Sequence, residues 1–294
     1  MWTRLLLPGS GEDGVAEPVL QLSGVMLLLR PFDESWLVGP LALATACLAV
    51  VVPSVRRAPV TWLILAVLSG ARVALAWPLA DNHHYLLAYW CLALALALSG
   101  PAPAAILATS ARWLLAAAFT LAVLWKGVLS PDYRDGTFFR VTLLTDARFA
   151  DASMIFGGLT PEEMTGNRAF LEPLPEGAEL LDPPPFVEPG RLKIFAGVAT
   201  WGGLALEAVI ALLLVLPSGA FVILARHAGL IAFCVTTYAL APVAGFGWLI
   251  ATLGMAQCAG HQRVLRGVYL AVFVLILVYA EIPWTAALRG WIVP

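Results

Sequence analysis

The sequence predicts an all-α fold, a polytopic transmembrane helical bundle with about eight spans. Of its 294 residues, 61% are hydrophobic and 12% are charged, whereas soluble domains average about a quarter charged residues. The apolar residues form continuous runs rich in Leu, Ala and Val, unlike the short alternating segments of a transmembrane β-barrel. Backbone N–H and C=O groups must pair internally in lipid, so these continuous runs predict helices.

Most of the predicted spans are apolar runs of about 17–25 residues, the length that crosses a hydrocarbon core of about 30 Å. The third and seventh runs are shorter. Proline and glycine interrupt the chain at the ends of most of these runs. The eight runs cover residues 35–52, 60–79, 85–99, 112–129, 194–216, 220–241, 243–258 and 264–282.

Four segments follow from this division. Residues 1–34 form an N-terminal segment, in which Val19–Leu29 is too short to span and is predicted to be an interfacial or re-entrant helix. Residues 35–129 are the first transmembrane half, and residues 194–294 are the second. Residues 130–193 connect the halves as a long aqueous loop.

The loop of residues 130–193 differs from the rest of the chain in charge. It contains 11 acidic and 6 basic residues, which makes it the acidic part of the protein. Thr160 followed by Pro161 is typical of a helix N-terminus, so one short helix is expected there, lying on the bilayer surface. This loop is also the candidate docking surface for a protein or peptide partner.

The loops on one side of the predicted bundle collect most of the arginines outside the long loop. The positive-inside rule places that side in the cytoplasm, so both termini and the acidic loop are expected to face outward from a plasma (inner) membrane. Apart from the lipid bilayer itself, no partner follows from charge: no basic run indicates nucleic acid. The arginines on the predicted cytoplasmic side are Arg56, Arg57, Arg112, Arg226, Arg263 and Arg266.

Few ionisable residues fall at membrane depth, where a charge costs about 2.5–3.5 kcal/mol and therefore faces a cavity or a partner. Glu207 lies near the middle of a predicted span. Arg72, Lys126 and Glu281 lie toward the outer ends of three others, and Asp81–His84 caps the outer end of the span that holds Arg72. Two interpretations of Arg72 stay open: pairing with a carboxylate such as Asp81, Glu207 or Glu281, or binding a ligand anion.

Lys126 is one of only two lysines in the chain; the other is Lys193. A lysine ammonium can lose its proton when it is desolvated, whereas an arginine guanidinium cannot. A neutral Lys126 could act as a general base. The alternative is that Lys126 only extends from a helix end to the membrane interface.

The adjacent histidines His83 and His84 should point in different directions on a helix, and they lack the i, i+4 spacing of a two-histidine metal site. No metal is therefore predicted. The pair either forms a hydrogen-bonded cap at the end of the span or takes part in an acid–base or quinone site.

Two local patterns stand out: Asn82-His83-His84-Tyr85-Leu86, and a stretch that begins at Arg112. They resemble the membrane domain of the vitamin K-dependent gamma-carboxylase, a member of the horizontally transferred transmembrane (HTTM) domain family. The first is similar to that family's Asn-His-x-Tyr-Leu stretch. The stretch from Arg112 is similar to a family helix that ends in lysine and is followed by an aspartate–aromatic element and an acidic–glycine pair. Here these are Lys126, Asp132-Tyr133 and Asp135-Gly136, and the resemblance extends over about residues 60–257.

The resemblance implies that Lys126 is the catalytic lysine that deprotonates a reduced quinone of the naphthoquinone type, and that His83 or His84 matches the family's histidine. We therefore expect Lys126, His83 and His84 to be catalytic, with Arg72, Asn82, Glu207 and Glu281 binding the cofactor. Two departures argue against peptide carboxylation: the chain ends with its last span at Pro294, and Phe233–Tyr238 contains no histidine. The rival function is a non-catalytic membrane partner in peptide maturation, assembly or immunity; a transporter ranks third because no inverted repeat is visible.

Overall fold

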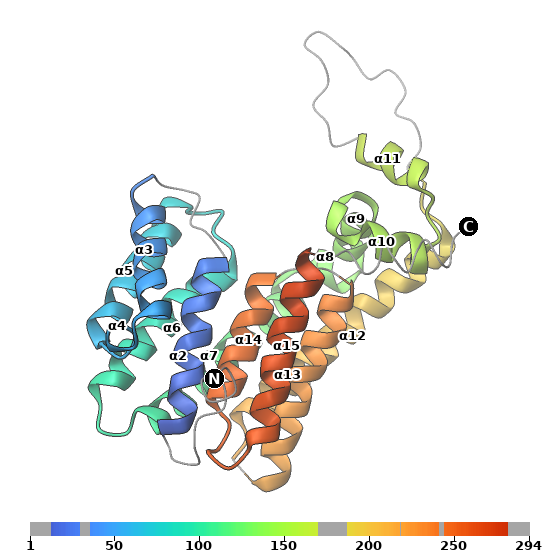
Figure 1. Ribbon diagram of the computed structural model, residues 1–294. Helices are drawn as coiled ribbons and strands as arrows, with labels where there is room; N and C mark the ends of the chain where they lie inside the picture. The colour runs from blue at the N-terminus through green and yellow to red at the C-terminus, as the bar shows by residue number, and fades with distance from the viewer. Residues whose placement is uncertain (1–12, 30–35, 170–186, 218, 241–243, 282–294) are drawn as a thin grey trace.

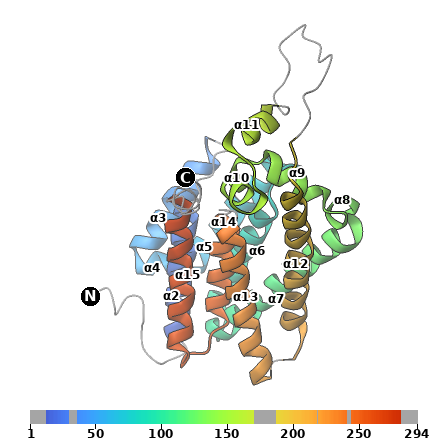
Figure 2. The ribbon, with the colours of Figure 1, turned by 90° about the vertical axis from the view of Figure 1, so that its right-hand side faces the viewer.

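The chain folds into a bundle of long helices with a group of short helices at one end (Figures 1 and 2). Within the part of the chain that the structure describes, three helical stretches are long and apolar enough to cross a membrane: Pro103–Leu129, Gly190–Val215 and Ala220–Leu240. These helices confirm the predicted class, an all-helical membrane protein. The computed structural model describes residues 13–29, 36–169, 187–217, 219–240 and 244–281.

The helices before the long connection are α2 (Asp13–Leu29), α3 (Val38–Val51), α4 (Pro53–Arg56), α5 (Pro59–Leu75), α6 (Asn82–Ser99) and α7 (Pro103–Leu124). The helices after it are α12 (Gly190–Val215), α13 (Ala220–Leu240), α14 (Ala244–Ala256) and α15 (Arg263–Glu281). α7 is longer than the predicted span because Pro103 occupies its first turn, where the missing N–H needs no partner.

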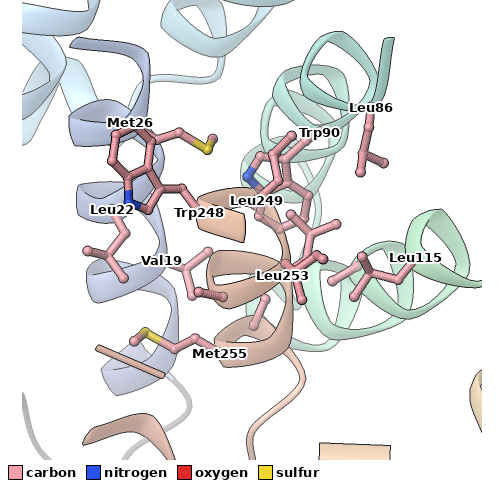
Figure 3. Close-up of a cluster of buried hydrophobic side chains, with 14 of the residues drawn as sticks. Val19, Leu22, Met26, Leu86, Trp90, Leu115, Trp248, Leu249, Leu253 and Met255 are labelled. Atoms are coloured by element: carbon pink, nitrogen blue, oxygen red, sulfur yellow. The ribbon is translucent and has the colours of Figure 1, made fainter. Parts of the chain in front are cut away.

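α2 lies inside the bundle, which corrects the expectation of an interfacial helix. It packs against α3, α7 and α14. Figure 3 shows Val19, Leu22 and Met26 of α2 facing Trp248 on α14 within a cluster of buried side chains. Val19 is fully buried, so neighbouring helices rather than lipid headgroups cover this apolar face.

The beginning of α2 also lies at an unexpected end of the bundle. Glu17 forms ion pairs with Arg56 and Arg57 in the turn between α3 and α5, with 2.9 Å between Arg57 Nε and Glu17 Oε2. The start of α2 therefore shares an end with these arginines, whereas the sequence predicted the opposite end. The prediction missed α2 as an additional helix packed within the bundle.

Two further arginines bind the last turn of α12. Arg112 donates through Nε to the Leu214 carbonyl at 2.7 Å, and Arg226 donates to the Leu213 carbonyl at 3.2 Å. The last carbonyls of a helix have no partner within the helix and carry its negative dipole end. These cations therefore stabilise the end of α12 and tie it to α7 and α13.

Short helices occupy much of the predicted aqueous loop. We call residues 131–169 and 187–189 the outer cap, after the side of the membrane predicted for this segment. It contains α8 (Pro131–Arg134), α9 (Thr137–Thr145), α10 (Ala150–Ala152), the π turn η3 (Ser153–Gly157) and α11 (Pro161–Ala169), which gather at one end of the bundle in Figures 1 and 2. The cap has its own hydrophobic cluster, built from Leu143, Leu144, Met154, Leu159 and Met164 against Leu192 and Ala196 of α12.

The sequence correctly predicted the start of α11. Thr160 Oγ1 accepts the Glu163 N–H at 3.2 Å, and Glu163 Oε2 accepts the Thr160 N–H at 2.8 Å. This reciprocal pair is a capping box, which satisfies two backbone donors at a helix start. The preceding α9 and η3 were not predicted because, at nine and five residues, they are too short to show a clear helical period.

The outer cap should lose stability in acid through one ion pair. Arg140 donates to both oxygens of Glu188, at 2.5 and 2.7 Å, and these bonds lower the pKa of Glu188. A lowered folded-state pKa means that the pair stabilises the cap above about pH 4.3, the usual glutamate value, and that this is lost as pH falls through the lower folded pKa.

We therefore expect Glu188→Gln to destabilise the cap by about 0.5–1 kcal/mol at pH 7, with the difference from the parent protein becoming smaller as the pH falls toward 3. Thermal unfolding of the purified protein between pH 3 and pH 7 measures this. The exposed Glu162 supplies the control: Glu162→Gln should leave the profile unchanged. An equal difference at both pH values would contradict the ion-pair explanation.

Candidate functional site

Lys126 lies in η1 (Trp125–Leu129), a single π-helical turn that extends α7 at the outer-cap end of the bundle. π-helical turns within α-helices are rare and occur frequently at functional sites. The turn stops at Ser130 because Pro131 starts α8, and Ser130 Oγ accepts the Tyr133 N–H at 3.3 Å to cap it. This sharp change of direction places Tyr133 back toward the lysine.

The amine of Lys126 is paired with the predicted mid-membrane carboxylate. Lys126 Nζ donates to Glu207 Oε1 at 2.5 Å, which joins η1 to α12. The Glu207 side chain is 8% exposed and that of Lys126 is 28% exposed. The second oxygen, Glu207 Oε2, is buried and has no hydrogen-bond partner among the described residues. The carboxylate therefore retains one acceptor that a ligand or a water molecule could use.

Tyr133 completes this cluster. Its ring centroid lies 5.2 Å from Lys126 Nζ, within the range of a cation–π interaction. Burial raises the pKa of the Tyr133 phenol, and the negative charge of Glu207 raises it further, so the phenol keeps its proton at neutral pH. A β-carbon at Gly203 of α12 would meet the Tyr133 hydroxyl at 3.5 Å, an ordinary van der Waals distance, so the phenol packs directly against α12.

Arg72 and the two histidines form a second cluster. Arg72 of α5 lines a small pocket with His83 and His84 of α6, closed by Met26, Leu87, Gly245 and Leu249. The two imidazole centroids are 4.3 Å apart at an interplanar angle of 64°. The expectation that adjacent histidines point apart is therefore wrong here: their backbone positions diverge, but their side-chain rotamers bring the rings into contact.

This pocket does not fit a quinone. It has room for about one water molecule, whereas pockets for ring-sized cofactors enclose about 300–1,000 Å³. The pocket is therefore too small for Arg72, His83 and His84 to hold a quinone within it as predicted.

The predicted single site is thus divided between two places. Lys126 and Glu207 lie together, and Arg72 lies with both histidines, but the residues that line the pocket and those that contact Lys126 are different. Asn82 is exposed at the first position of α6. The side chain of Glu281 lies outside the described residues.

Sequence reasoning missed Tyr133 as a site residue, although it noted the Asp132-Tyr133 element. The Ser130-Pro131 pair could have indicated it, because serine followed by proline is typical of a new helix start. A new helix at this point changes the direction of the chain, so Tyr133 can lie against the helix that precedes it. It also missed Asp81 as a partner of the histidines. One ligand atom from each of Asp81, His83 and His84 lies within 4.8 Å of the others.

Comparisons with protein-family models, with curated proteins and with solved structures found no match. The fold and the two polar clusters define a class: a helical membrane protein with ionisable groups at one end of its bundle.

Proposed function

We propose that this is an HTTM-type membrane enzyme in which the Lys126–Glu207 pair is an acid–base centre for a lipid-soluble reactant, with a reduced quinone as the candidate. The observation that carries the proposal is the 2.5 Å hydrogen bond between Lys126 Nζ and Glu207 Oε1 beside the buried Tyr133. A lysine without a partner at a helix end would favour the interpretation that its side chain only extends to the membrane interface. A lysine that binds a buried carboxylate favours the interpretation that it belongs to a functional site.

The pair has a direct route for moving a proton. Glu207 can take the proton from Lys126 Nζ along their hydrogen bond, which leaves a neutral amine and a neutral carboxyl group. A neutral amine is the form that accepts a proton from a reactant. The protonated phenol of Tyr133 can donate a hydrogen bond to an oxygen that becomes negative in that step.

The surroundings of Lys126 support approach from the bilayer. Trp125, Val128 and Leu129, on the same π turn, are each more than 60% exposed. An exposed apolar surface of this kind suits lipid contact and gives a lipid-soluble reactant access to the partly exposed amine. A naphthoquinone-type ring would bind against this surface and supply the acidic hydroxyl, while Lys126 Nζ and Tyr133 supply the polar contacts.

The proposal includes an orientation. We take nine helices as membrane crossings: α2, α3, α5, α6, α7 and α12–α15. The ends that carry Arg56, Arg112 and Arg226 then lie on one side, which the positive-inside rule assigns to the cytoplasm. The outer cap and Lys126 lie on the opposite, extracytoplasmic side of a plasma membrane. In this arrangement the beginning of α2 faces the cytoplasm. A membrane-impermeant amine reagent added to intact cells should label the exposed Lys193 beside the cap; labelling only after lysis would reverse the orientation.

Quinone bound to the purified protein tests the function. After mild detergent extraction, mass spectrometry should find an isoprenoid quinone that is reduced at least tenfold in Lys126→Met. Lys126→Arg keeps the charge but cannot lose a proton, so it should keep the quinone and lose turnover of its reduced form. Lys193→Arg alters the only other lysine and is the matched control. Equal quinone content in all variants, or none in the parent protein, would refute the proposal.

A docking partner is the second candidate function, and the outer cap favours it. The cap has its own hydrophobic cluster, yet Phe138, Val141 and Phe156 stay about half exposed on its outside. Exposed apolar side chains beside charged ones are typical of protein-binding surfaces. If partner binding is the whole function, the Lys126→Arg protein should keep every activity of the parent, whereas Phe138→Ser should lose it.

A further inference from the structure

We propose that Asp81, His83 and His84 form a binding site for a divalent transition-metal ion of the zinc type, with a fourth position open to the pocket that contains Arg72. This site is separate from the Lys126–Glu207 pair and does not depend on the function proposed for that pair. It also revises the sequence-based expectation that no metal is bound.

The three ligand atoms are already close together. Those of Asp81, His83 and His84 all lie within 4.8 Å of one another. Nitrogen and oxygen ligands bind Zn²⁺ at about 2.0–2.2 Å, which places tetrahedral ligands about 3.4 Å apart. Small side-chain rotations therefore suffice to bring the three atoms onto one ion.

Asp81 is positioned to act as the carboxylate ligand. It is the N-cap residue of α6, with an extended backbone, but its side chain makes no capping hydrogen bond. An aspartate at this position would usually bond the backbone N–H groups of the first turn. The carboxylate here is instead directed to the imidazoles that follow it in the same turn.

Burial differs across the cluster in a way that suits ion entry. Asp81 is exposed, His83 is half-buried and His84 is buried. An ion can therefore arrive on the exposed side of Asp81 and be held on the inner side by His84. The pocket next to the imidazoles has room for about one water molecule, the usual fourth ligand of an open zinc site.

The nearby cations define what the open position would accept. Arg72 lines the same pocket, and the charge of Arg148 in the outer cap interacts with that of Asp81. Two guanidinium groups weaken binding of a bare cation but stabilise an anionic ligand on it, such as hydroxide or a small carboxylate. We therefore expect moderate, micromolar affinity that tightens when such an anion is present.

The ligand set selects the type of metal. Two imidazoles with one carboxylate suit Zn²⁺, Co²⁺, Ni²⁺ or Fe²⁺, whereas Ca²⁺ and Mg²⁺ prefer six or more oxygen ligands, including water. Zn²⁺ and Co²⁺ are the useful probes, because Co²⁺ reports its coordination through its visible absorption. Mg²⁺ serves as the negative control.

Calorimetric titration of the full-length, untagged protein in detergent, after removal of metals with a chelator, tests the site. We expect one Zn²⁺ per chain, with affinity reduced at least tenfold by Asp81→Asn, His83→Ala or His84→Ala. His261→Ala removes an exposed histidine far along the chain, in the connection between α14 and α15, and should leave binding unchanged. Mg²⁺ should give no binding heat.

Two results would overturn the proposal: no stoichiometric Zn²⁺ binding by the parent protein, or binding that His261→Ala reduces while Asp81→Asn does not. His84→Ala changes a buried residue, so its folding is checked by gel filtration. If that variant misfolds, the exposed Asp81→Asn variant decides the outcome. Co²⁺ added to the parent protein should also produce visible absorption bands that Asp81→Asn weakens and excess Zn²⁺ removes.

Discussion

Replacement of Lys126 by methionine should lower the free energy of unfolding by about 3–5 kcal/mol, because it leaves the buried Glu207 carboxylate without its partner. The methionine keeps much of the aliphatic packing of the lysine, so the loss is attributable to the missing ammonium. Unfolding in mixed micelles of a mild detergent and SDS, followed by circular dichroism, measures the change.

The reciprocal variant separates charge from packing. Glu207→Gln keeps the size of the side chain and removes the charge, so it should cost less than Lys126→Met. The double variant Lys126→Met/Glu207→Met should recover most of the stability, since replacing both members of a buried pair by apolar residues is often neutral or stabilising. If the double variant lost as much stability as the Lys126→Met and Glu207→Met single variants lose together, the pair would not be coupled in the folded protein.

Replacement of Gly254 by alanine should destabilise the bundle by about 1–3 kcal/mol. Gly254 lies on α14 against Tyr269 of α15, and a β-carbon there would overlap the tyrosine ring and approach its hydroxyl to 2.8 Å. Tyr269 is fully buried and shares a 2.8 Å hydrogen bond with His227 of α13, so the ring has little freedom to move. Small residues at helix contacts in membranes permit this close approach.

Gly267 on α15 is the matched control, because a β-carbon at that position meets no atom within 4 Å. Gly267→Ala should therefore leave the midpoint of thermal unfolding unchanged or raise it slightly, since alanine favours a helix over glycine. The measurement is the loss of the monodisperse gel-filtration peak after heating. Equal midpoints for the two variants would show that α14 and α15 do not pack through Gly254.

The ionisable residues illustrate how far sequence reasoning reached toward the site. Lys126 and Glu207 could be singled out because charges are rare in apolar spans, and the structure pairs them. Their pairing could not be derived from the sequence, since they are 81 positions apart and the sequence offered Glu207 as a partner of Arg72 instead. Which helices become neighbours depends on packing of the whole bundle, and hydropathy carries little information about it.

The histidines show the same limit at short range. Adjacent side chains diverge on an ideal helix, and that rule predicted that the two imidazoles point in different directions. Rotamer choice at the first turn of α6 brings the rings within 4.3 Å, and Asp81 joins them from outside the helix. Rotamers respond to neighbouring helices, here α2, α5 and α14 around the pocket, and these contacts are invisible in a local sequence pattern.

The sequence by itself determined that this is a helical membrane protein, because its apolar runs can satisfy their backbone groups in lipid only as helices. It also determined the start of α11 through its capping box, which is a local interaction. Only the tertiary structure decided that α2 is an internal helix, that residues 131–169 fold into a cap, and that the polar residues form two clusters. Those outcomes depend on contacts between distant segments, whose free energies are set by shape and burial rather than by composition.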